Sequence, residues 1–171
     1  SFMVISLFLA PLSLWGLTVH SSRTRFTGRL NSGVRLHMDT ISFSNIPPEK
    51  TAALQHTFLL IKSGKENGTI DEDLVRGALG AHVNQFVSDP VVVRELMEKW
   101  QKDRSFELPW EFGSWIDALM NCELAFHSVE LRNDGTGELR FEQLAWPSGG
   151  LDATEEIIKA FGGTVTSNSA I

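Results

Sequence analysis

The two residues best placed for chemistry are His127 and Gln143, because the sequence predicts that they share the inner face of a β-hairpin. Polar and apolar residues alternate with a period of two on both sides of the turn-forming segment 133–137 (NDGTG), as in a half-buried hairpin. The expected inner face carries Ala125, His127, Val129 and Leu131 before the turn, and Leu139, Phe141, Gln143 and Ala145 after it.

In that register Leu131 lies opposite Leu139, and the imidazole of His127 faces the amide of Gln143. The pair could hold a ligand or transfer a proton in a pocket floored by the sheet, with Glu123 or Asp117 as the orienting carboxylate. The alternative is structural, with the two side chains bonding each other at the end of the core.

Residues 134–144 (DGTGELRFEQL) resemble the calcium-binding half of an EF-hand. With Gly137 at the sixth loop position, Asp134 takes the third, but Arg132 and Gln143 take the first and twelfth, where calcium needs carboxylates. A second loop around residues 67–71 fails the same test, because its first, third and twelfth positions would be Ser63, Lys65 and Leu74. We therefore expect no metal site, and a degenerate EF-hand-like protein without calcium binding is the third interpretation of the chain.

The remaining reactive residues form no familiar catalytic set. Cys122 is the only cysteine of the 171 residues, so a disulfide or a multi-cysteine metal site cannot form within them. It lies five residues before His127, on the opposite face of a continuous strand. HExxH, GxSxG, P-loop and dinucleotide glycine motifs are absent from the sequence. We expect no cofactor and no catalytic residue, and favour a protein that is not an enzyme.

Tryptophans gather in the second half of the chain, at positions 100, 110, 115 and 146. They could stack on a pigment or anchor a larger complex, or they could fill the core between helices and sheet. We expect most of them in the core, with Trp110 or Trp146 as the exposed exception. These two residues join His127 and Gln143 as candidate ligand-binding residues.

Acidic residues dominate the chain from Asp39 onward. That part holds 11 Lys and Arg against 21 Asp and Glu, a net charge of −10. A domain of this charge repels phosphate backbones, so we expect no nucleic-acid partner.

The first 38 residues have a different composition. Residues 2–17 are an apolar run interrupted by Pro11, and residues 20–38 carry four arginines without an acidic residue. The two segments in series resemble the bipartite plastid-targeting leaders of algae with secondary plastids. The resemblance implies a leader over residues 1–38, import into a plastid by the secretory route, and no stable membrane span after its removal. The alternative is a secreted or membrane-anchored protein.

Periodicity and capping signals predict an α+β fold, in which three to four N-terminal helices pack on a small antiparallel sheet centred on the hairpin and a C-terminal helix closes the domain. The expected elements are an edge strand or ordered arm at 39–45, a helix ending at Lys62, a loop at 63–68, and helices at 70–86, 90–102, 112–119 and 152–161. Thr69 and Glu72 predict a capping box, and Asp152 with Glu155 caps the last helix. We expect one globular domain over 39–163 and a frayed tail over 164–171.

The leading functional interpretation is a soluble, non-enzymatic plastid protein that binds other proteins as an accessory subunit or assembly factor. The alternative is a small-molecule or pigment-binding domain, or an enzyme, with a pocket at the hairpin. An enclosed pocket reaching His127 would favour the second interpretation, and a flat apolar patch would favour the first.

Overall fold

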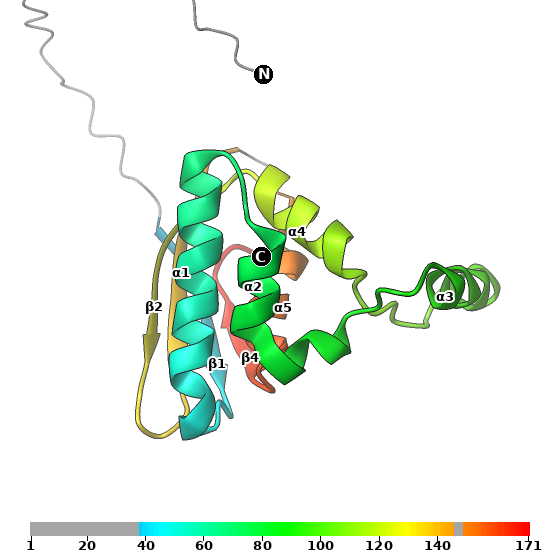
Figure 1. Ribbon diagram of the computed structural model, residues 1–171. Coiled ribbons are helices and arrows are strands. Elements are labelled where there is room, and N and C mark those ends of the chain that lie inside the picture. The colour runs from blue at the N-terminus through cyan, green and yellow to red at the C-terminus, as the bar shows by residue number, and fades with distance from the viewer. Residues whose placement is uncertain (1–37, 146–148) are drawn as a thin grey trace, which may run out of the picture. The chain divides into compact units, whose positions relative to one another are not determined.

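The computed structural model describes residues 38–145 and 149–171, so Trp146 and all of the predicted leader except Met38 lie outside the described residues. The described part contains a four-stranded antiparallel sheet in the order β2-β3-β1-β4 (Figure 1). Its strands are β1 (Met38–Ser44), β2 (Leu124–Leu131), β3 (Gly137–Gln143) and β4 (Thr164–Asn168).

Five α-helices accompany this sheet, which confirms the predicted α+β class. They are α1 (Thr51–Asn67), α2 (Glu72–Leu79), α3 (Pro90–Lys102), α4 (Phe112–Asn121) and α5 (Leu151–Lys159), with 3-10 turns at Pro48–Lys50 and Gly80–Gln85. None of the helices in the described ranges is both long and apolar enough to cross a bilayer.

One face of the sheet is buried against the helices, and the other is exposed to solvent. Every second residue is buried in β1 and in β3 as far as Phe141, and the spacing of Leu54, Phe58 and Ile61 gives α1 a matching apolar stripe. The rings of Phe58 and Phe126 pack edge to face with 5.9 Å between their centres, and this contact joins α1 to β2. On the outer face Arg140 lies 3.0 Å from both Glu130 and Glu138. The core therefore lies between the sheet and the helices.

The predictions for both ends of the described chain need correction. β1 is an inner strand, paired with β3 and β4, instead of an edge strand or an arm. The tail over 164–171 is not frayed, because β4 pairs with β1 and the Ser169 hydroxyl accepts a hydrogen bond from the Thr40 amide at 2.8 Å. β4 has only five residues, too few for a clear alternating pattern in the sequence. It forms a strand because it can pair with the edge of β1 that β3 leaves open.

Four helix ends also differ from prediction. α1 continues to Asn67, and Gly68 ends it in the left-handed conformation with φ of 81°, so the predicted loop at 63–68 is mostly helix. α2 is capped by Asp71, whose carboxylate accepts from the Leu74 amide at 3.0 Å, and not by Thr69. It ends at Leu79 because Gly80, at φ of 56°, interrupts it. α5 has Gly150 at its N-cap instead of Asp152.

A β-bulge overturns the predicted register of the hairpin. Phe126 pairs with Phe141, but Ser128 pairs with Arg140, so His127 is an extra residue in β2. The bulge reverses the alternation, and Leu124 and Phe126 face the core while His127 is exposed. Beyond the bulge Val129 lies opposite Leu139, where the prediction placed Phe141.

Candidate functional site

Residues 88–110, which we call the arm, leave the body of the domain and return to it at one point. Val87 and Glu111 pair there as an isolated parallel bridge, in which the Val87 amide donates to the Trp110 carbonyl at 2.9 Å. No residue of the arm is buried, and Figure 1 shows α3 standing apart from the other helices. The arm thus adds little to the core, and its apolar residues need another explanation.

Local hydrogen bonds shape both ends of α3 in the arm. Asp89 caps α3 by accepting from the Val91 amide at 2.8 Å, and Pro90 occupies the first turn, as predicted. At the other end Asp103 accepts from the Ser105 amide and hydroxyl at 3.0 and 2.6 Å, which turns the chain back.

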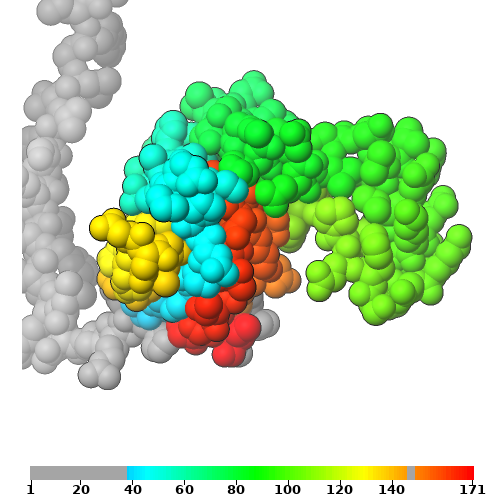
Figure 2. All heavy atoms as spheres, turned by 90° about the horizontal axis from the view of Figure 1, so that it is seen from below, coloured from blue at the N-terminus to red at the C-terminus, as the bar shows by residue number. Residues whose placement is uncertain are grey.

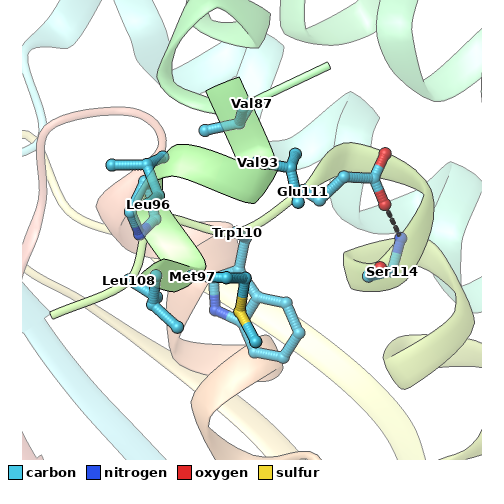
Figure 3. A pocket seen from close by; sticks show the side chains of 9 residues that line it. Val87, Val93, Leu96, Met97, Leu108, Trp110, Glu111 and Ser114 are labelled. Carbon is cyan, nitrogen blue, oxygen red and sulfur yellow. Dashed lines mark hydrogen bonds between the residues drawn. The ribbon is translucent and has the colours of Figure 1, made fainter. Parts of the chain in front are cut away.

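A groove lies between α3 and the returning chain, and we call it the Trp110 groove. It has a volume of about 320 Å³. Figure 3 shows the side chains of Val93, Met97 and Trp110 turned toward the shared space. The complete lining is Val87, Val93, Leu96, Met97, Leu108, Pro109, Trp110, Glu111 and Ser114. Only Glu111 and Ser114 bring polar side chains, so the groove is suited to apolar surface.

Apolar surface continues outside the groove along α3. Val91, Val92 and Met97 are 51%, 40% and 40% exposed. A run of three valines spans about 200° of a helix, so one buried stripe could not have covered all of them. The three successive valines were thus the sequence signal for the site. The pattern of the helix at 90–102 by itself predicts only that Val92, Val93, Leu96, Met97 and Trp100 share one side.

Glu111 fixes one wall of the groove. Its carboxylate caps α4 by accepting from the Ser114 amide at 2.6 Å and the Gly113 amide at 2.9 Å. The hydrogen bonds from Ser114 and then Gly113, with a smaller effect of Arg76, hold the pKa of Glu111 below its usual value. The carboxylate therefore stays ionised and committed to the helix, which leaves the groove without a free base.

The structure separates His127 from Gln143. The His127 Nε2 lies 3.8 Å from a Glu142 carboxylate oxygen on the outer face, whereas Gln143 Nε2 donates to Asp39 Oδ2 at 3.0 Å. The predicted pairing of the two side chains is therefore wrong, because the bulge turns His127 outward. Gln143 instead borders an open cavity beside Asp39 and the last three residues of the chain. A ligand-binding role for either residue stays a prediction.

The tryptophans divide between core and groove. Trp115 is fully buried in α4, and its indole N–H donates to the Ala153 carbonyl at 2.9 Å. Trp110 is half-buried and borders the groove, while Trp146 lies outside the described residues. Of the three predicted ligand-binding residues that the structure describes, Trp110 alone lines the Trp110 groove.

The EF-hand-like segment forms the hairpin turn. Asp134 Oδ1 accepts from the Thr136 amide at 3.0 Å and from its hydroxyl at 2.7 Å, and Arg132 lies 2.6 Å from Glu138. These bonds hold the Asp134 carboxylate within the turn.

No protein-family model, curated protein or solved structure matches this chain. What the site can do therefore follows from its own geometry. A projecting helix with exposed apolar side chains and an apolar groove at its base can bind an apolar surface.

Proposed function

We propose that this chain is a non-enzymatic plastid protein that binds a protein partner through the Trp110 groove, as an accessory subunit or assembly factor. The observation that carries the proposal is the arm, 23 residues without a buried side chain that still present Val91, Val92 and Met97 to solvent. Exposed apolar patches of this kind mark interaction surfaces in soluble domains. The arginine-rich, acid-free composition of residues 20–38 supports the plastid location.

Charge and shape define the partner. The groove runs beside α3, whose 13 residues span about 20 Å, which suits an amphipathic helix laid against it. The chain from Asp39 carries a net charge of −10, so basic residues flanking the partner's apolar face would be attracted. The partner is therefore expected to be an amphipathic helix with basic flanks.

Site-specific photocrosslinking tests the proposal. A photoreactive amino acid replaces Met97 in the groove, and in a second protein it replaces Leu59, which is 58% exposed on α1. Both proteins are irradiated in an extract of the source cells, and adducts are identified by mass spectrometry. We expect a protein adduct specific to position 97.

The identified protein must then bind as a purified component. Calorimetry should show that Met97→Asp weakens binding by at least about tenfold, the cost of placing one charge in an apolar interface, while Leu59→Asp leaves it unchanged. A small-molecule adduct at position 97 would support the alternative of a ligand-binding domain, for which 320 Å³ is a sufficient volume. Equal adducts at both positions would contradict the groove as the binding site.

A further inference from the structure

A second cavity, of about 670 Å³, adjoins the Trp110 groove on the side that faces α5. Figure 2 shows the arm as a lobe with an opening between it and the body. Leu108, Pro109 and Trp110 border both the groove and this cavity, so one partner can reach both. We call it the acid-aromatic cavity, after Trp100, Phe106, Trp110, Glu107, Asp152 and Glu156 in its lining.

Three carboxylates and one ammonium group line this cavity. Among the described residues, none forms a hydrogen bond or salt bridge with the side chains of Glu107, Asp152 or Glu156. The one cation in the lining, Lys159, lies 3.2 Å from Glu155 instead. The lining thus carries more negative than positive charge, and its one ammonium group is paired with a carboxylate outside the lining.

Aromatic rings supply the other half of a cation site. Trp100 already accepts a guanidinium, because Arg104 Cζ lies 3.6 Å above the centre of its ring. Trp110 and Phe106 bring further ring surface to the same cavity. A ring surface beside a carboxylate favours organic cations, and guanidinium above ammonium because it stacks and is more weakly hydrated.

We propose that the acid-aromatic cavity binds an arginine side chain of the protein partner. The inference rests on the proposed function and adds that the partner carries an arginine next to the apolar face that fills the Trp110 groove. Glu156 is central because it comes from α5 and is half-buried. Burial raises the pKa of Glu156, against an opposing effect of Lys159, and a guanidinium placed beside it would relieve that cost.

The experiment uses a matched pair of small probes, n-butylguanidinium and its neutral analogue n-butylurea, added to the whole chain labelled with nitrogen-15. The indole N–H signals of the tryptophans report on the cavity directly. We expect n-butylguanidinium to shift the Trp100 and Trp110 signals saturably, with at least about tenfold higher affinity than n-butylurea, the ratio given by a cation–π contact and an ion pair together.

Glu156→Gln and Glu107→Gln should each remove most of that preference, while Glu123→Gln, at an exposed position before β2, should leave it intact. Thermal melts establish whether the variants fold. If Glu156→Gln does not fold, Glu107→Gln still tests the inference. Equal binding of the two probes, or a preference that survives both substitutions, would overturn the inference.

The two proposals fail separately. A protein adduct at position 97 with no guanidinium preference would leave the proposed function standing and overturn the arginine site. A guanidinium preference without a protein adduct would overturn the proposed function, and with it the assignment of the cation to a partner.

Discussion

Gln143 donates a hydrogen bond from Nε2 to Oδ2 of Asp39 over 3.0 Å, which joins the ends of β3 and β1 across 104 positions of the chain. Asp39 is only 2% exposed, and the Ser169 hydroxyl donates to its other oxygen at 3.0 Å. The Gln143 amide, which the sequence predicted as a partner of the His127 imidazole, thus donates its hydrogen bond to the buried Asp39 carboxylate.

Removing the Gln143 amide should therefore lower the free energy of unfolding more than removing the His127 imidazole. We expect Gln143→Ala to lower the free energy of unfolding by about 1 to 3 kcal/mol, because it deprives a buried carboxylate of a donor. His127→Ala, at an exposed bulge, should change it by less than about 0.5 kcal/mol. Urea unfolding of both variants measures the difference, and equal losses would contradict the separation of the two residues.

Much of the fold could be predicted because its signals are local. The Asp89-Pro90 start of α3, the spacing of Phe112, Trp115, Ile116 and Leu119 in α4, and the glycine-rich hairpin turn each lie within a few residues. The bulge at His127 could not be predicted, since alternation with a period of two describes only regular strands. β4 was missed because a five-residue strand is defined by its pairing with β1 and not by its own pattern.

The site was predicted only in part, for a related reason. Trp110 was a candidate, but α3 has the amphipathic pattern of a packed helix, and periodicity does not tell whether the matching surface belongs to the same chain. The sequence placed Val93, Leu96 and Met97 on one side of a helix, and the structure shows that they border an open groove. Three successive valines were the only indication of exposure.

Lys65 should be a strong determinant of stability. Its ammonium donates to the carbonyls of Leu119, Met120 and Cys122 at 2.9, 2.9 and 2.6 Å, where α4 ends. We expect Lys65→Met to cost about 2 to 3 kcal/mol, since it removes the ammonium donor from three partly buried carbonyls, of which that of Leu119 keeps the Cys122 thiol as a donor. Lys62→Met, which removes only an i,i+4 pair with Glu66, should cost less than about 0.5 kcal/mol in the same denaturation assay.

Two glycines should respond to alanine with opposite signs. A Cβ on Gly137 would clash with the Glu130 carbonyl and the Phe43 ring, so we expect Gly137→Ala to destabilise the hairpin by more than about 2 kcal/mol. Gly77 lies within α2 with open space around it, and Gly77→Ala should stabilise by up to about 1 kcal/mol. Melting temperatures that move in the same direction would contradict this account.

Glu111 should contribute stability that depends on pH. Because its pKa is lower in the folded state than its usual value of about 4.3, the contribution is complete above that value and is lost as the pH falls through the folded-state pKa. Glu111→Gln should cost about 1 kcal/mol near neutral pH through the weakened cap, and the gap to the parent should close in acid. Glu95→Gln, on the exposed side of α3, serves as the control in urea titrations across this range, and a gap that stays constant would contradict the capping role.

The arm should be separable from the core. We expect the domain to fold when residues 88–109 are replaced by a Gly-Ser linker of about eight residues, which can reconnect the two parallel ends of the Val87 to Glu111 bridge. The free energy of unfolding should stay within about 1 kcal/mol of the parent value, because no buried residue is removed and a shorter loop costs less entropy to close. Circular dichroism and the fluorescence of buried Trp115 report on the remaining fold. Loss of cooperative unfolding would show that the arm belongs to the core, whereas a stable variant that no longer binds the partner would assign the arm to recognition alone.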